Sequence, residues 1–244
     1  MAPAAIVSDV KLADNVPETN QTAANEPTNY LFSLRNKTIL ITGGGRGLGI
    51  TLAAAVVESG GNAACLDILP EPSPEAWGSL QRIAKLSGLR VSYYKCDITQ
   101  EADLSRVIEE ITEEGKRIRA PFAGAIACAG VQQKIPALDY SAEDFSRILH
   151  INVTGTFLTA KYAARSFVEN NIKGSIVLIA SMSGDIANRG LTCTAYNTSK
   201  SAVHQMCRSV AQEWGQYGIR VNTLSPGVRI VISSVKQASI LIAW

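Results

Sequence analysis

The chain has 244 residues, a net charge of +2 and a hydrophobic content of 46%. This size and composition are typical of one globular α/β domain with a substantial core. The nearly balanced charge excludes a strongly basic surface for nucleic acid, and no apolar run reaches the roughly 18 residues that a bilayer-spanning helix needs. The first residues also lack the basic and apolar regions of a secretory signal. We therefore expect neither a nucleic-acid partner nor a membrane partner.

The five cysteines are scattered along the chain and contain no Cys-x-x-Cys pair. They are found at positions 65, 96, 128, 193 and 207. Several of them fall in predicted strands or helices, where a buried free thiol is the usual state. This usage favours a reducing, cytoplasmic compartment, and we expect no metal site.

Residues 1–33 are rich in Ala, Asn, Thr, Pro and acidic residues and show no sustained periodicity, which indicates a mobile extension. From Lys37 onward, strand and helix patterns alternate. The predicted strands cover residues 37–42, 62–67, 90–96, 122–128, 174–180 and 218–224. The predicted helices cover residues 48–59, 74–86, 101–116, 142–170 and 198–216. This alternation predicts a doubly wound parallel sheet of the Rossmann type, in a single domain over residues 34–227.

Two local patterns mark helix starts. The buried strand that ends at Thr42 is followed by Gly43, Gly47 and Gly49, and then by an apolar helix. Glycine allows positive φ and lets a phosphate approach the backbone, while the first helical N–H groups face that phosphate. We interpret this turn as a dinucleotide site, because the strand and the helix that the motif requires are both present. The alternative is a glycine-rich surface turn. Separately, Ser141 and Asp144 predict a capping box at the start of the long helix.

Asp67 ends the second predicted strand, about twenty residues after the glycine turn. An acid at this place accepts hydrogen bonds from the adenosine ribose and repels a 2′-phosphate, which favours NAD. Arg46 favours NADP instead, since a guanidinium beside the turn can pair with the 2′-phosphate of that cofactor. We expect NAD, with NADP as the alternative.

Tyr196 and Lys200 lie one helical turn apart and so share a helix face. A predicted strand runs directly into Ser181, and ligands of doubly wound sheets bind beyond the carboxyl ends of strands. A phenol near pKa 10 needs roughly 4 kcal/mol of stabilisation to ionise near neutrality, and the Lys200 cation is a suitable source. Asn152 lies inside a predicted helix, where Asn is unfavourable, so it has either a functional role or a structural polar contact.

From residue 34 to residue 227 the sequence resembles the short-chain dehydrogenase/reductase family. The motifs that carry the resemblance occur in family order: Thr42-Gly-x-x-x-Gly-x-Gly49, Asp97, Ala129-Gly130, Asn152, Ser181, Tyr196, Lys200 and Pro226-Gly227. The resemblance implies that Tyr196 is the general acid/base, that Lys200 lowers its pKa and binds the nicotinamide ribose, and that Ser181 orients the substrate. Asn152 would hold a proton-relay water. The implied cofactor contacts are Gly43, Arg46, Gly47, Leu48, Gly49, Asp67, Asp97, Ala129, Gly130, Tyr196, Lys200, Pro226 and Gly227.

Shorter segments are similar to fungal polyol dehydrogenases of the arabinitol, mannitol and sorbose types. These segments are Leu31–Leu34, Ser181–Gly184, Tyr196–Lys200, Glu213-Trp214 and Ile219–Gly227. They imply a small sugar alcohol or ketose as substrate. One departure from the family follows the fourth strand, where Ala127-Cys-Ala-Gly130 replaces Asn-Asn-Ala-Gly, so that the bracing asparagine contacts are lost and Cys128 fills their volume as a small hydrophobe.

The largest departure comes after Pro226-Gly227. The family continues there with a substrate-covering loop and helices, and later with a last strand. This chain instead has an atypical apolar tail over residues 228–244, so we expect the last strand and the substrate-covering region to be missing. Our hypothesis is that the tail is translated from an unspliced intron or follows a frameshift.

Three kinds of protein fit these observations. The first is an oxidoreductase that transfers a hydride between a nicotinamide cofactor and a secondary alcohol or ketone. The second is a catalytically impaired nucleotide-binding remnant of such an enzyme, because substrate positioning supplies much of the rate. The third is an interaction protein that uses helices 142–170 and 198–216. Family members associate through these helices, so we expect them to form a homo-oligomer interface, in a dimer or a tetramer.

Overall fold

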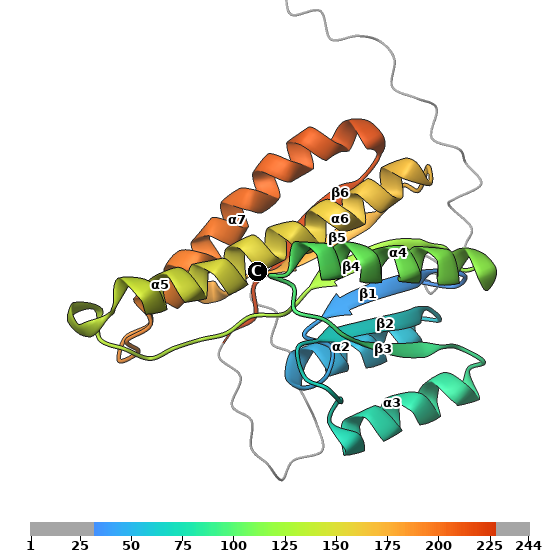
Figure 1. The fold of residues 1–244 in the computed structure, drawn as a ribbon, viewed down its shortest axis with the longest axis horizontal. Helices are drawn as coiled ribbons and strands as arrows, with labels where there is room; N and C mark the ends of the chain where they lie inside the picture. Colours follow the sequence, from blue (N-terminus) through green and yellow to red (C-terminus); the bar gives the residue numbers. More distant parts are fainter. Residues whose placement is uncertain (1–31, 228–244) are drawn as a thin grey trace, which may run out of the picture. The chain divides into compact units, whose positions relative to one another are not determined.

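The computed structural model describes residues 32–227, which form a six-stranded parallel sheet with the strand order β3-β2-β1-β4-β5-β6 (Figure 1). The strands are β1 (Thr38–Thr42), β2 (Asn62–Asp67), β3 (Val91–Lys95), β4 (Phe122–Ala127), β5 (Ser175–Ile179) and β6 (Arg220–Leu224). The order reverses between β1 and β4, which creates the topological switch point of a doubly wound sheet. The predicted fold class is therefore confirmed.

Six α-helices connect the described strands. They are α2 (Gly47–Glu58), α3 (Pro74–Leu86), α4 (Glu101–Arg117), α5 (Ala142–Leu149), α6 (Thr156–Glu169) and α7 (Thr194–Trp214). A π-helical turn, η3 (His150–Gly155), joins α5 to α6. Short 3-10 turns are η2 (Ala137–Asp139), η4 (Met182–Gly184) and η5 (Gly215–Tyr217). Ser141 and Asp144 pair at the start of α5, as predicted: the amide of Asp144 donates to Ser141 Oγ at 3.0 Å, Ser141 Oγ donates to Asp144 Oδ2 at 2.9 Å, and the helix begins at Ala142. The reciprocal bond to the Ser141 side chain is thus made by its hydroxyl.

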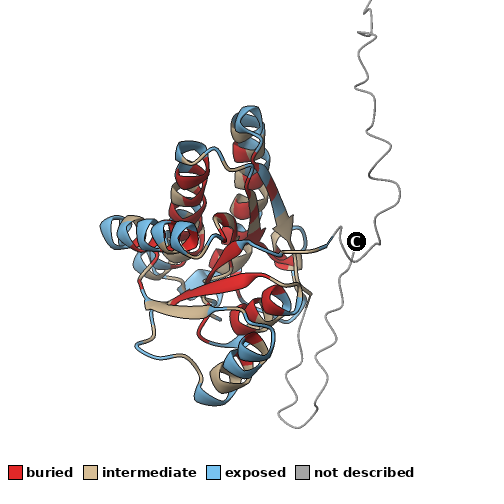
Figure 2. Cartoon of the chain, turned by 90° about the vertical axis from the view of Figure 1, so that its right-hand side faces the viewer, coloured by how far each residue is buried: buried red, intermediate tan, exposed pale blue. Residues whose placement is uncertain are grey.

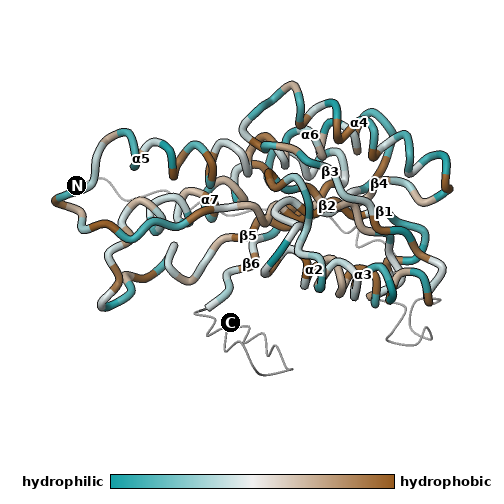
Figure 3. The backbone as a smooth tube through the Cα atoms, turned by 60° about the horizontal axis from the view of Figure 1, so that its bottom comes forward, coloured by the Kyte–Doolittle hydropathy of each residue, from teal (hydrophilic) through white to brown (hydrophobic). Residues whose placement is uncertain are grey.

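The core has two layers because alternate residues of a strand point to opposite faces of the sheet. Leu40 and Leu66 pack against α4, α6 and α7, whereas Ile41 and Cys65 pack against α2 and α3. Figures 1 and 3 show these two sets of helices on opposite sides of the strands, and Figure 2 shows the buried strands between them. Both faces of β1 and β2 are thus covered, which explains their continuous apolar sequence.

Two predicted helices differ from the structure. The last helix begins at Thr194 and not at residue 198, because burial of Ala195, Ser199 and Lys200 outweighs the weak helix propensity of the Asn-Thr-Ser run before Lys200. The predicted helix over 142–170 is interrupted by the η3 turn. Tyr196 therefore lies inside α7, in the same helix as Lys200.

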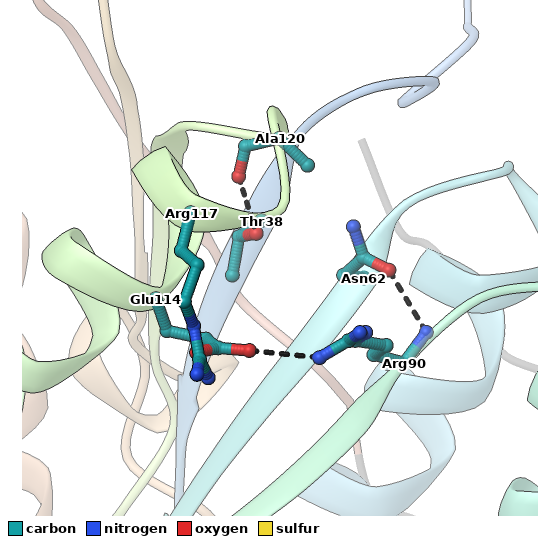
Figure 4. Close-up of polar contacts among 6 residues, drawn as sticks. All are labelled: Thr38, Asn62, Arg90, Glu114, Arg117 and Ala120. Atoms are coloured by element: carbon teal, nitrogen blue, oxygen red, sulfur yellow. Dashed lines mark hydrogen bonds and ion pairs between the residues drawn. The ribbon is translucent and has the colours of Figure 1, made fainter.

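Hydrogen bonds and an ion pair made by side chains connect segments at the amino ends of the strands (Figure 4). Thr38 Oγ1 donates to the carbonyl oxygen of Ala120 at 2.7 Å, which links β1 to the segment before β4. Asn62 Oδ1 accepts the amide of Arg90 at 2.8 Å, and the Arg90 guanidinium pairs with Glu114 on α4 at 2.9 Å. These contacts hold β1, β2 and the segments before β3 and β4 together at this end of the sheet.

Within residues 32–227 the sheet ends at β6, whose Asn222 is exposed. On the side of the sheet that α2 and α3 cover at β1 and β2, Val177 of β5 is only half-buried. The described part of the chain therefore contains neither a seventh strand nor a helix over this part of the sheet. The predicted mobile extension up to residue 31 and the apolar tail 228–244 lie outside the described residues.

Candidate active site

The glycine turn lies between β1 and α2, at the carboxyl edge of the sheet. Gly43 has φ +67°, and a Cβ there would lie 2.9 Å from the Cα of Ala129. At Gly49 a Cβ would lie 2.0 Å from the carbonyl oxygen of Gly43, so α2 approaches the turn too closely for any side chain. No side chain caps the amino end of α2, and its first turn carries no acid. Its N–H groups and the positive end of its dipole are thus available for a phosphate.

The carboxylate of Asp67 is fixed beside the same turn. Its Oδ2 accepts the amide of Gly45 at 3.0 Å, and its Oδ1 accepts the amide of Leu69 at 3.2 Å. Burial, followed by the charge of Asp67, raises the pKa of the neighbouring Tyr93 phenol to about 12. Arg46 is the N-cap residue of α2 and is exposed. The acid is therefore built into the turn, whereas the guanidinium extends from its surface.

Thr42 supplies part of the bracing that the missing asparagine would give. Its Oγ1 accepts the amides of Cys128 and Ala129 at 3.1 and 3.2 Å, which ties the end of β1 to the segment after β4. Cys128 is half-buried, and burial raises the pKa of its thiol to about 11, so that the thiol stays protonated near neutral pH. Cys128 thus packs as a small apolar side chain against the core layer that contains Ile41, in the way that the sequence predicts for this position.

A cavity of about 260 Å³ lies beside the glycine turn. Seven predicted site residues line it: Leu48, Gly130, Ser181, Tyr196, Lys200, Pro226 and Gly227. They come from α2, from the segments after β4, β5 and β6, and from α7. Gly43 and Gly49 lie on either side of the adjoining turn, and Asp67 contacts the turn from the end of β2. The sheet topology therefore brings together residues that are as far apart in sequence as Leu48 and Gly227.

Lys200 is only 4% exposed, and its Nζ donates to the carbonyl oxygen of Ile179 at 2.7 Å. Burial lowers the pKa of this ammonium group to about 8. Its Nζ lies 5.6 Å from the centroid of the Tyr196 ring. A Cβ at Gly130 would lie 3.2 Å from Asn152 Oδ1, so the glycine leaves room for the Asn152 side chain beside the lysine.

Burial raises the pKa of the Tyr196 phenol above its usual value, and a hydrogen bond from Ser181 partly offsets this effect. Lowering of the Tyr196 pKa by Lys200 stays a prediction, because burial of the phenol dominates here and the Lys200 ammonium donates to the Ile179 carbonyl.

Ser181 is the N-cap residue of the η4 turn after β5, and its Oγ accepts the amide of Ser183 at 3.2 Å. Ser181 lines the cavity, whereas the hydroxyl of Ser183 accepts from the side chain of Asn188. The hydroxyl that faces the phenol is therefore that of Ser181, because Ser183 is turned toward the following loop.

Asn152 is fully buried in the η3 turn. Its Oδ1 accepts the amide of Val131 at 2.8 Å, and its Nδ2 donates to the Val131 carbonyl at 2.9 Å and to Ser199 Oγ at 3.0 Å. The side chain thus joins the segment after β4 to α7. These contacts match the structural alternative for Asn152, whose backbone carbonyl accepts from Thr156 Oγ1 at 2.7 Å, and the proton-relay role stays a prediction.

Asp97 lies after β3 and does not line the cavity. Its Oδ1 accepts both the amide and the hydroxyl of Thr99, at 2.9 and 2.8 Å.

A larger hollow of about 530 Å³ lies at the opposite, amino ends of the strands, beside Arg35, Arg90 and Arg117. Ligands of parallel sheets bind at the carboxyl ends, so the smaller cavity is the candidate site.

Five cavity residues were not predicted from the sequence: Cys128, Val131, Gln132, Ile179 and Ala180. Gln132 follows the Ala129-Gly130 turn, and its exposed amide has no hydrogen bond to another described residue. Its position in the segment that follows β4 was the available signal. Ile179 acts through its carbonyl oxygen, which no side-chain pattern reveals.

Among residues 32–227 there is no group of three metal-ligating side chains, and no helix is both long and apolar enough to cross a membrane. All five cysteines are unpaired.

Fold and site together define a dinucleotide-binding α/β oxidoreductase. Comparison with known proteins is consistent with this class, because residues 37–236 match the family described as short chain dehydrogenase. The chain therefore belongs to the short-chain dehydrogenase/reductase family, and it is an oxidoreductase of the kind that acts on CH–OH groups.

Similar proteins come from fungi and bacteria. The short chain dehydrogenase/reductase notP′ of Aspergillus versicolor is 45% identical over 201 residues, which cover 81% of this chain and 68% of that protein. The ribulose-forming D-arabinitol 2-dehydrogenase of Candida tropicalis is 35% identical over 204 residues, covering 80% and 71%. The family match extends past Gly227 to residue 236, into the segment that we interpret as atypical.

Solved structures show the same fold. A short-chain dehydrogenase/reductase from Mycobacterium marinum superposes with a TM-score of 0.75 at 34% identity, covering 83% of this chain and 78% of that one. An NAD⁺-bound xylitol dehydrogenase gives a TM-score of 0.69 at 31% identity, covering 80% and 71%.

Proposed function

We propose that this protein transfers a hydride between NAD and the secondary alcohol of a small polyol, or the ketone of the corresponding ketose. The observation that supports this function most strongly is the meeting of Ser181, Tyr196 and Lys200 at one cavity beside an uncapped, glycine-lined helix start. A proton-transfer group, a hydrogen-bond donor and a cation then surround one point. This is the set that alcohol oxidation requires.

The side chains divide the work as follows. Tyr196 Oη takes the hydroxyl proton of the substrate in oxidation and returns it in reduction. Ser181 Oγ donates a hydrogen bond to the same substrate oxygen as charge develops on it. Lys200, held by the Ile179 carbonyl, supplies positive charge below the phenol and a donor for a ribose hydroxyl. The nicotinamide cofactor supplies the hydride acceptor or donor.

The residues of the site fit a dinucleotide. Side chains at Gly43 or Gly49 would fill the space beside the turn, and the N–H groups of α2 are free of a side-chain cap. We assign NAD, and not NADP, because Asp67 is held in place by two backbone amides while Arg46 is exposed. A 2′-phosphate would lie against a fixed carboxylate.

The substrate class rests on two supports. D-arabinitol 2-dehydrogenases and a xylitol dehydrogenase are among the similar proteins. In addition, the unengaged amide of Gln132 at the cavity offers both a donor and an acceptor to a substrate hydroxyl. We further propose that the domain spans residues 34–227, that it acts in the cytoplasm, and that it associates as a dimer or tetramer through α5, α6 and α7.

Titration of the purified full chain with NAD and with NADP, followed by turnover assays on a panel of pentitols, hexitols and ketoses, tests the proposal. We expect at least tenfold tighter binding of NAD, which corresponds to about 1.4 kcal/mol, and cofactor reduction with at least one polyol. A tenfold preference for NADP would show that Arg46 outweighs Asp67. Tight NAD binding without turnover of any polyol or simple secondary alcohol would instead favour the impaired remnant.

A further inference from the structure

A second set of polar side chains lies next to the site and takes no part in the chemistry above. His204 Nε2 is 2.7 Å from Ser225 Oγ, and His204 Nδ1 is 3.1 Å from Asp185 Oδ1. The three residues come from α7, from the segment after β6 and from the segment after η4. The side chain of His204 is 11% exposed, whereas that of Asp185 is 69% exposed. The contact with Ser225 is thus the sheltered one.

The chemistry of the partners fixes the direction of these hydrogen bonds. An ionised carboxylate only accepts, so Nδ1 carries a proton and donates it to Asp185. In the neutral ring Nε2 is then an acceptor, and the hydroxyl of Ser225 donates to it. Ser225 is thereby held by a side chain of α7.

The position of His204 connects this contact to the cavity. Tyr196, Lys200 and His204 follow one another at intervals of four residues, so they lie along one face of α7. Ser225 immediately precedes Pro226 and Gly227, which line the cavity. Besides this contact, the segment is attached to the segment after β5 by the amide of Met182, which donates to the Pro226 carbonyl at a long 3.3 Å.

The same three residue types form the nucleophilic triad of many hydrolases. Two observations argue against that role here. The residue after Ser225 is Pro226, which has no N–H, so the usual oxyanion donor after a nucleophile is missing. Ser225 also does not line the cavity.

We infer that His204 is a positioning residue that holds the Ser225–Gly227 segment as one wall of the cofactor cavity. Only the expected effect of His204 on NAD binding rests on the proposed function. The attachment of Ser225–Gly227 to α7 can be tested without any cofactor. Loss of the contact frees the Pro226 carbonyl to move away from Met182 and lets the cavity widen.

Three variants of the full chain test this role. Ser225→Ala removes the hydroxyl. In His204→Asn the side-chain amide lies at the position of Nδ1 and cannot reach Ser225. In His204→Gln the longer side chain places its amide at the position of Nε2, within reach of Ser225. Gln205→Ala, on the exposed side of the same helix, is the matched control. Hydrogen exchange at the Met182 amide is measured without cofactor, and the dissociation constant of NAD is measured by titration.

We expect Ser225→Ala and His204→Asn to speed Met182 exchange at least fivefold and to weaken NAD binding three- to tenfold. We expect His204→Gln and Gln205→Ala to stay within twofold of the parent chain. Unchanged Met182 exchange in Ser225→Ala would overturn the inference, and so would labelling of Ser225 by a fluorophosphonate, which would mark it as a nucleophile. If Ser225→Ala speeds exchange of the Met182 amide but the parent chain does not bind NAD, the positioning role of His204 is supported and the proposed function is refuted.

Discussion

Lys200 is the residue at which stability and function oppose each other most clearly. It is a cation with 4% exposure, its one hydrogen bond goes to a neutral carbonyl, and no carboxylate pairs with it among the described residues. Burial lowers its pKa from 10.5 to about 8, which corresponds to a cost of about 3 kcal/mol for the charged form. Buried cations without a paired carboxylate are typical of functional sites, which supports the proposed catalytic role of Lys200.

Replacement of this lysine by an apolar side chain is therefore expected to stabilise the fold. At pH 7 the variant Lys200→Met loses the buried charge but leaves the Ile179 carbonyl without its donor, so we expect a net gain of about 2 kcal/mol in unfolding free energy. Because the folded-state pKa is below the unfolded value, the penalty in the parent chain is complete below about pH 8 and disappears as the pH rises to 10.5. Urea unfolding at pH 7 and pH 10 measures both effects.

In that experiment the difference between the two chains should shrink from pH 7 to pH 10, while Lys200→Met has no measurable turnover. A variant that is less stable than the parent chain at pH 7 would contradict the assignment of a desolvated ammonium. Comparison with Lys200→Met removes the contributions of other groups that titrate in this range, since both chains share them.

At the scale of elements, the η3 turn determines how two parts of the site meet. The Asn152 side chain leaves this turn and bonds to Val131 after β4 and to Ser199 on α7. The helical periodicity of residues 142–170 predicts a continuous helix, which is nearly correct, but it does not show the local widening that π-helical turns introduce at functional sites. The partners of Asn152 come from elements distant in sequence, so no local pattern could have revealed them.

The variant Asn152→Ala should show how much this junction contributes. It removes three hydrogen bonds and leaves the amide and carbonyl of Val131 without partners, so we expect a loss of about 3 kcal/mol in unfolding free energy. Asn170→Ala is the control, because Asn170 makes one side-chain bond at the end of α6 and should cost about 1 kcal/mol or less. Denaturant unfolding gives the unfolding free energy of both variants. Equal losses in the two variants would argue that Asn152 does not hold the segment after β4 against α7.

At the scale of the whole molecule, alternation of strand and helix patterns was sufficient to predict a doubly wound parallel sheet, because parallel strands need crossover helices. The strand order 3-2-1-4-5-6 comes from the structure. Tyr196 and Lys200 could be predicted from their spacing and their place after a strand. The Ile179 carbonyl, Gln132 and the His204–Ser225 contact could not, since they depend on how three-dimensional packing turns backbone and side chains toward one cavity. The expected oligomer and the domain limits stay predictions.

The central claim is that Tyr196 moves the proton at a site where NAD is already bound. The most direct measurement compares the parent chain with Tyr196→Phe, using NAD titration and polyol-dependent NADH formation on the same preparations. Removal of the phenolic oxygen leaves the glycine turn and Asp67 intact, so we expect the NAD dissociation constant to stay within about threefold while turnover falls at least about 100-fold. Turnover in Tyr196→Phe comparable to that of the parent chain would contradict the account.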